Sequence, residues 1–178
     1  LVLKDDLKYW CDMGYSYIGA PWFNGFATPQ EPYRLFGVGN GGFSLRSIHD
    51  CLKVLSGYRY VPKKNGSSVN NFRLGLKKFL RDRVIFAHNH YPFMPRANED
   101  IFWGTCVPHA YKSYMVADVE TALNFSFEVM PRLMYELNGK KLPFGCHAWE
   151  KYDFGFWLEQ LGADYFDSQQ DSLNSFLA

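Results

Sequence analysis

The glycine-rich stretch VGNGGFSLRS, residues 38–47, is the feature that most restricts the folds open to this chain. It places Gly39, Gly41 and Gly42 around Asn40 and then continues into the apolar, β-prone letters FSL. Glycine tolerates backbone conformations that other residues avoid, and it lets another group come close to the backbone. The stretch therefore predicts either a sharp turn before a strand or a close contact at the backbone. A phosphate-binding loop is not indicated, because the Lys-Ser/Thr of a P-loop is missing and the glycine spacing does not fit GxGxxG.

Short strand and helix patterns alternate on both sides of this stretch. YSYIGAPW, residues 15–22, has the alternating aromatics of a strand, and residues 48–57 carry apolar side chains at helical spacing. A second helix is expected from Asn98 onward, with Pro108 interrupting or ending it. The patterns also predict a strand end and short helix over residues 1–14, a helical turn and strand over 115–128, and a last amphipathic helix over 152–162. Such alternation predicts an α/β fold.

Composition narrows the class of protein. With 178 residues, of which 47% are apolar, the chain is long enough for one globular domain. The net charge is only +1 and the lysines and arginines are scattered, which argues against a dedicated nucleic-acid binder. The four cysteines form no CxxC pair, so we expect free thiols in a reducing compartment. Aromatic residues reach 19%, and besides filling a core they stack on bases and on the apolar faces of sugars.

The first candidate site is ANEDIFWG, residues 97–104. Asn98 can cap a helix, and Glu99 with Asp100 would then lie in the first turn, where the helix dipole favours carboxylates. That alone is a sufficient structural reason for the acidic pair. The alternative is that one of these carboxylates serves as a general base in a cleft, with Trp103 one turn further on as a flat wall for a sugar ring.

The second candidate is PFGCHAW, residues 143–149, where Pro143 and Gly145 predict a turn from which His147 and Trp149 project. His147 is either a structural histidine or a ligand of a divalent metal. In NFSFE, residues 124–128, a buried Glu128 would need a partner, for which Arg46 and Arg132 are the candidates.

These motifs, taken as an ordered set, carry a family resemblance. YSYIGAPW, GVGNGGFSLRS, NEDIFWG, NFSFE and PFGCHAW, spread over residues 1–157, resemble a mostly bacterial family of glycosyltransferases that is classed as a domain of unknown function with a GT-A-like fold. More distantly, the set is similar to the C-terminal half of galactosyltransferases. The resemblance implies an α/β architecture with a GT-A-like mixed sheet flanked by helices, and transfer of a sugar from a nucleotide-sugar donor to a glycan acceptor.

The resemblance also implies roles for individual residues. Asp100 would be the base that deprotonates the acceptor hydroxyl, with Glu99 beside it in the acidic pair, and His147 would approach the metal or the diphosphate. The residues implied in substrate binding are Asn40, Gly41, Gly42, Arg46, Trp103 and Trp149. The implied cofactor is Mn²⁺ or Mg²⁺, held in such enzymes by an Asp-x-Asp strand that would precede Leu1. We therefore expect residues 1–178 to be one domain, the acceptor-side portion of an enzyme whose nucleotide-binding half is absent from this sequence.

The implied location is cytoplasmic, with peripheral association at the inner face of the membrane left open.

Two other hypotheses remain at this point. One is a non-catalytic carbohydrate-binding module, which would use the same aromatic residues. The other, weaker one is a metal-dependent hydrolase in which His88, His90 and His147 converge on one metal.

Overall fold

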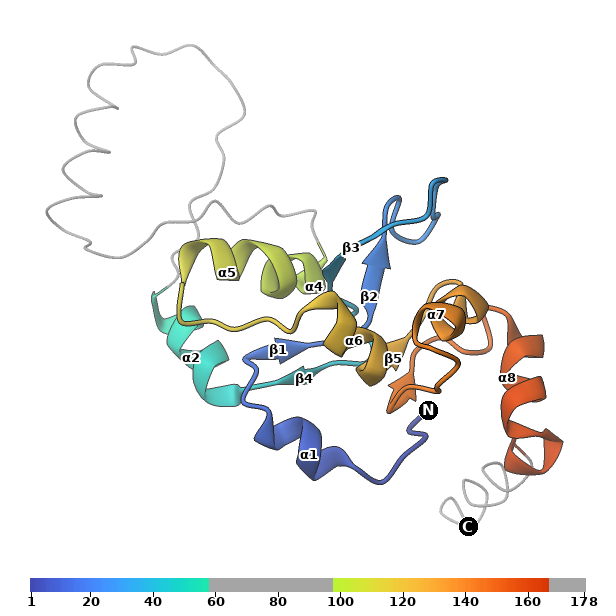
Figure 1. Ribbon diagram of the computed structural model, residues 1–178. Coiled ribbons are helices and arrows are strands. Elements are labelled where there is room, and N and C mark those ends of the chain that lie inside the picture. Colours follow the sequence, from blue (N-terminus) through green and yellow to red (C-terminus); the bar gives the residue numbers. More distant parts are fainter. Residues whose placement is uncertain (58–97, 167–178) are drawn as a thin grey trace, which may run out of the picture.

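The computed structural model describes residues 1–57 and 98–166, which are drawn in colour in Figure 1. The strands are β1 (Tyr17–Ile18), β2 (Pro21–Phe23), β3 (Leu35–Val38), β4 (Leu45–Arg46), β5 (Ser126–Phe127) and β6 (Gly145–Cys146). The helices are α1 (Leu7–Asp12), α2 (Ile48–Gly57), α4 (Glu99–Ile101), α5 (Val107–Ala110), α6 (Val119–Phe125), α7 (Pro131–Leu137) and α8 (Phe154–Leu161), with a π-helical turn, η2 (Phe102–Cys106), between α4 and α5. The described residues mix helices with short strands, so the α/β prediction is confirmed in its broad sense.

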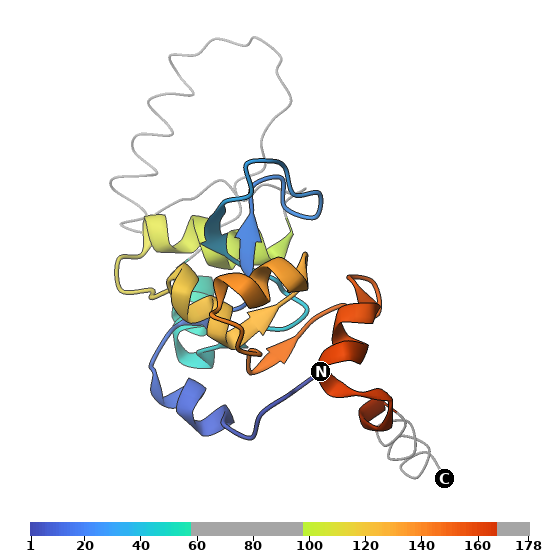
Figure 2. The same ribbon diagram turned by 45° about the vertical axis from the view of Figure 1, so that its right-hand side comes forward.

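The strands pair in three short two-stranded sheets within the described residues. β1 with β4 and β2 with β3 are antiparallel, whereas β5 with β6 is parallel. The opening LVL runs beside β6 through an antiparallel bridge from Val2 to Gly145, in agreement with its strand-like sequence. Figures 1 and 2 show the α4–α5 segment above the β1–β4 pair and α1 below it. The β2–β3 hairpin extends from the body beside α4.

The helix that begins at Glu99 runs past Pro108 and ends at Ala110. Proline has no N–H, and its ring crowds the carbonyl four residues earlier, so an ordinary α-helix is strained at this point. The chain adopts a wider turn here, in which the N–H of Val107 donates to the carbonyl of Phe102, five residues back. Pro108 therefore interrupts the regular helix, as expected, without ending it.

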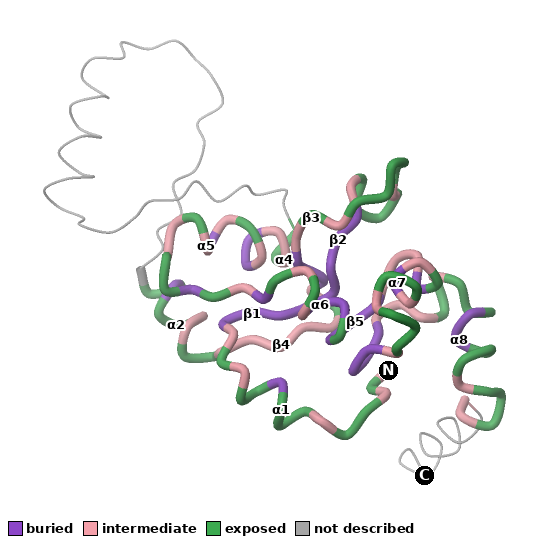
Figure 3. The backbone as a smooth tube through the Cα atoms, in the orientation of Figure 1, coloured by how far each residue is buried: buried purple, intermediate pink, exposed green. Residues whose placement is uncertain are grey.

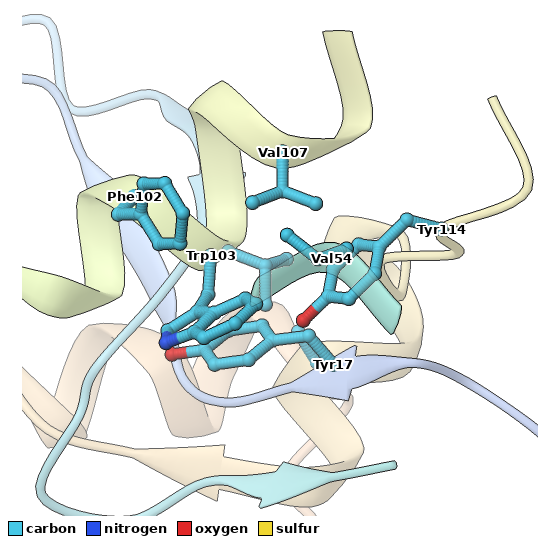
Figure 4. Packing of buried hydrophobic residues seen from close by; sticks show 8 residues of the cluster. Tyr17, Val54, Phe102, Trp103, Val107 and Tyr114 are labelled. Atoms are coloured by element: carbon cyan, nitrogen blue, oxygen red, sulfur yellow. The ribbon is translucent and has the colours of Figure 1, made fainter. Parts of the chain in front are cut away.

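Three clusters of buried side chains hold these elements together. The first packs α2, η2 and α5 against β1, and it contains Trp103, which lies stacked on Tyr114 with ring centroids 5.8 Å apart (Figure 4). The second packs α7 and α8 against β2, β5 and β6 around Trp157. The third packs α1 against β1 and α6 around Trp10. Most buried residues lie on the strands and on the inner faces of the helices (Figure 3), so much of the high aromatic content serves the core.

Helix α6 begins at a side-chain cap, which gives a first testable prediction. The carboxylate of Asp118 accepts a hydrogen bond from the N–H of Thr121 (2.7 Å), and this bond lowers the pKa of Asp118 below its usual 3.8. Replacing Asp118 with alanine should lower the free energy of unfolding by about 1 kcal/mol at neutral pH. Since the folded-state pKa is the lower one, this contribution is present above pH 3.8 and disappears as the pH falls through the folded-state pKa.

Urea denaturation of wild type and Asp118→Ala at several pH values measures this difference. Asp118→Ser is the control, because a serine hydroxyl keeps the cap but does not titrate. An Asp118→Ala deficit that stays constant down to acid pH would contradict the electrostatic part of this explanation.

Candidate functional site

The glycine stretch forms both a turn and a close contact. Asn40 adopts a left-handed backbone (φ 72°), and its Oδ1 accepts a hydrogen bond from the N–H of Gly42 (3.1 Å), which closes the turn between β3 and β4. A β-carbon on Gly39 would lie 1.6 Å from Cζ2 of Trp22. Both predictions for this stretch are therefore correct. Asn40 makes the sharp turn, and Gly39 makes the close contact.

Gly41 and Gly42 lie against two candidate site residues that are distant in sequence. A β-carbon on Gly41 would lie 1.7 Å from Oε1 of Glu99, and one on Gly42 would lie 2.0 Å from Nε2 of His147. The turn thus brings the acidic motif and the PFGCHAW motif to neighbouring backbone positions. Any larger residue at either position would displace one of these side chains.

Glu99 forms an ion pair with Arg46, with Nη2 and Oε1 3.0 Å apart. The Glu99 side chain is 56% exposed, so the pair adds at most about 1 kcal/mol to stability. The guanidinium of Arg46 also lies over the ring of Tyr17, at 5.3 Å from its centroid. Burial raises the pKa of Tyr17, and this outweighs the opposite effect of the neighbouring Arg46 charge. Strand β4 and the start of α4 thus place one cation and one carboxylate at the edge of the glycine turn.

His147 follows β6 directly and pairs with Glu128, which follows the adjacent strand β5. The two atoms in contact, Nδ1 and Oε1, are 3.0 Å apart. Because β5 and β6 are parallel, their carboxyl ends lie side by side, and this brings the two side chains together. Gly145 is a strand residue here, so the turn predicted at that position is wrong.

The partners predicted for Glu128 are also wrong. Arg46 binds Glu99, and Arg132 binds Asp153 (2.7 Å) and Glu159 (2.7 Å) on and before α8. The strand register explains the difference. It holds His147 beside Glu128, whereas Arg132 lies on α7 and faces α8.

A pocket of about 190 Å³ lies beside this network, between the β2–β3 hairpin, the start of α4 and the segment after β5. Trp22 and Phe26 provide an aromatic wall, and their ring centroids are 5.3 Å apart. The polar side chains of the lining are Asn98, Asp100, Glu128 and Tyr152. Glu128 therefore belongs to both the pocket and the pair with His147.

Asp100 is the predicted base that lines this pocket, whereas Glu99 is not among its lining residues. Asp100 is half-buried, and its Oδ1 accepts a hydrogen bond from the N–H of Ile101 (2.8 Å). Asn98 is the N-cap residue of α4, as expected, but its side chain makes no cap hydrogen bond. Its amide is exposed and lines the pocket.

None of the six residues predicted to bind substrate is among the lining residues of this pocket. Asn40 is 3% exposed and holds the glycine turn, and Trp103 is 7% exposed within the first core cluster. Trp149 is half-buried and stacks on Phe166, with centroids 4.8 Å apart. Trp103 was considered only as a flat wall for a sugar ring, whereas the structure packs it in the core. Substrate contacts by all six residues stay predictions.

The sequence patterns did not predict that Trp22, Phe26 and Tyr152 line a pocket. Trp22 was visible as the last letter of YSYIGAPW, and Phe26 lies in a loop with φ 54° that no pattern singles out. Glu128 was noticed only as a buried carboxylate in need of a partner. The signal that could have found it is its place directly after a buried strand, where side chains meet at a sheet edge.

The described residues contain neither a cluster of metal-binding side chains nor a helix that could cross a membrane. Within residues 1–57 and 98–166, no three His, Cys, Asp or Glu side chains gather as a metal site would require. His88 and His90, proposed for the hydrolase hypothesis, lie outside the described residues. No helix in the described part of the chain has the length and apolarity to cross a membrane.

Comparisons with known proteins give one match. A search of curated proteins and a search of solved structures each found no significant relative. The family model described as "Protein of unknown function (DUF5672)" matches residues 1–147, which is most of the chain. The chain therefore belongs to the DUF5672 family.

Proposed function

We propose that this protein is a glycosyltransferase, which moves a sugar from a nucleotide-sugar donor to a hydroxyl of a glycan acceptor. The observation that carries the proposal is the lining of the pocket: Trp22 and Phe26 on one wall and the carboxylates of Asp100 and Glu128 beside them. A sugar ring has an apolar face that stacks on aromatic rings and hydroxyl groups that donate to carboxylates. The pocket has both kinds of partner within one small volume.

In this proposal the acceptor sugar lies in the pocket and Asp100 is the general base. The Asp100 carboxylate takes the proton of the acceptor hydroxyl as that oxygen attacks the anomeric carbon of the donor, and the nucleoside diphosphate leaves with the electron pair of the broken bond. One displacement of this kind inverts the anomeric centre. The GT-A-like fold and the inverting outcome rest on analogy with the family resembled.

The glycine turn would form the neighbouring part of the cleft. Gly41 and Gly42 leave bare backbone between Arg46 with Glu99 on one side and His147 on the other. A divalent cation, Mn²⁺ or Mg²⁺, would stabilise the charge on the leaving diphosphate. Among the described residues His147 would supply one nitrogen ligand at most, because no three ligating side chains gather there.

The test is a transfer assay on the intact protein with Mn²⁺, a panel of nucleotide sugars and a set of oligosaccharide acceptors. We expect release of nucleoside diphosphate from one donor, faster when an acceptor is present. Calorimetry with the same oligosaccharides runs in parallel. Saccharide binding without any turnover of donors would support the carbohydrate-binding module instead, and neither binding nor turnover would reject both.

A further inference from the structure

The pocket between the β2–β3 hairpin and the start of α4 is negatively charged. Asp100 and Glu128 are among its lining residues, whereas no lysine, arginine or histidine is among those that the structure describes. Asp100 is half-buried and the Glu128 side chain is only 19% exposed, so solvent screens their charges only in part. A ligand that enters the pocket therefore meets a negative potential.

Three cations of neighbouring segments do not cancel this charge. Arg46 is already paired with a carboxylate outside the pocket lining. Lys151 is an exposed residue whose Nζ lies over the ring of Tyr152, 4.8 Å from its centroid, so water screens its charge. His147 contacts Glu128, but its ring carries a positive charge only when it is protonated.

Two carboxylate oxygens of the pocket remain for a ligand. Asp100 uses Oδ1 to accept from the N–H of Ile101, and Glu128 uses Oε1 for the ring of His147. Within residues 1–57 and 98–166, Oδ2 of Asp100 and Oε2 of Glu128 have no hydrogen-bond partner. A carboxylate can only accept, so each oxygen calls for a donor on the ligand, and a positively charged donor gives the strongest bond.

The aromatic wall formed by Trp22 and Phe26 suits the same kind of ligand. Besides stacking on the apolar face of a sugar, an aromatic ring attracts a cation to its face. Aromatic rings beside carboxylates are therefore suited to an organic ammonium group. A bare metal ion needs several ligands at once, and no three His, Cys, Asp or Glu side chains gather in the described part of the chain.

We propose that the sugar bound in this pocket carries a free, protonated amino group, which makes the acceptor an amino sugar. Its ammonium group donates to Oε2 of Glu128, and its reacting hydroxyl lies at Asp100. A sugar with a carboxylate would bring a third negative charge beside these two, and the repulsion excludes it. The use of the sugar as an acceptor rests on the proposed function, whereas the preference of the pocket for an ammonium group does not.

The experiment is an NMR titration of the intact protein at about pH 7, where an amine with the pKa of an α-amino group is mostly protonated and an ordinary imidazole is mostly neutral. The indole N–H signal of Trp22, assigned with Trp22→Phe, reports binding. Glucose and galactose are each compared with their 2-amino, N-acetylated and uronic acid forms. Wild type should bind one 2-amino sugar about 10-fold more tightly than its parent and N-acetylated forms, as expected for one charge-assisted hydrogen bond, and should bind the uronic acid most weakly.

Glu128→Gln tests the residue that is assigned to the ammonium group. Glutamine keeps the size of the side chain and an acceptor for His147 but removes the charge, so most of the preference for the amino sugar should disappear. Binding of the parent sugar should change little. Glu150→Gln is the matched control, at an exposed residue outside the pocket lining, and it should keep the full wild-type preference.

Several results would contradict the proposal. Equal binding of the amino and parent sugars by wild type would overturn it, and so would tighter binding of a uronic acid or no binding of either amino sugar. A preference that survives in Glu128→Gln would overturn the assignment to Glu128. The titration contains no donor, so an amino-sugar preference in a protein that never turns over donor would reject only the proposed function. Transfer to sugars without such a preference would reject only the ammonium site.

Discussion

Replacing Gly39 with alanine is expected to lower the free energy of unfolding by about 3 kcal/mol, the largest stability effect that we predict for a single added methyl group. The added β-carbon would lie 1.6 Å from Cζ2 and 2.1 Å from Cε2 of Trp22. Trp22 is 8% exposed and lies on β2, which pairs with β3 directly before Gly39, so the ring cannot move aside without separating the hairpin from η2. Urea denaturation followed by tryptophan fluorescence measures the change.

Gly37 is the matched control for this substitution. It lies two residues earlier on β3 and faces the same ring, but a β-carbon there would be 3.5 Å from Cε3 of Trp22, an ordinary contact. Gly37→Ala should therefore be neutral or stabilise the fold by up to about 1 kcal/mol, since glycine weakens a strand relative to alanine. Similar losses in both variants would mean that backbone conformation, and not the close approach of Trp22, explains the glycine.

Replacing Asp100 with asparagine is expected to lower the rate of sugar transfer by about 10²- to 10⁴-fold, if Asp100 is the base. Asparagine keeps the size of the side chain and an oxygen that can accept from the N–H of Ile101, so the start of α4 should stay in place. Acceptor binding should weaken much less than turnover, because only proton removal is lost. Steady-state kinetics with saturating donor, together with calorimetry of the acceptor, separates the two effects.

Glu99→Gln is the comparison that tests the choice within the acidic pair. Glu99 is bound to Arg46 and lies outside the pocket lining, so its loss should reduce transfer far less than Asp100→Asn does. A larger effect of Glu99→Gln would move the base to that residue. Full activity in Asp100→Asn would remove Asp100 from the mechanism.

Local patterns predicted several features that depend on neighbours in the chain, although the turn expected at Gly145 was wrong. Helix α2 follows the apolar spacing of residues 48–57, and α8 lies within the predicted span 152–162. The left-handed turn at Asn40 agrees with the high local density of glycine. Each of these features is decided within one or two turns of backbone, by propensity, capping and the freedom of glycine.

Contacts between segments that are distant in the chain could not be predicted from local patterns. Trp103 was expected at a cleft wall, and it is a core residue because η2 turns its side chain toward Tyr17 and Tyr114 (Figure 4). Glu128 had two arginines as reasonable partners, yet the parallel pairing of β5 and β6 gave it His147. Ion-pair preference is nearly the same for any oppositely charged partner, so only proximity selects among them.

By itself, the sequence determined the class of fold, the glycine turn and the motifs from which candidate residues come, because these depend on composition and on short-range geometry. Only the tertiary structure decided which candidates share a site. It grouped Asp100 and Glu128 with Trp22 in one pocket and joined His147 to Glu128. It also placed Gly41 and Gly42 against Glu99 and His147. The physical reason is that strand register and helix packing set distances between residues that are 19 to more than 100 positions apart in the chain, and no local propensity encodes those distances.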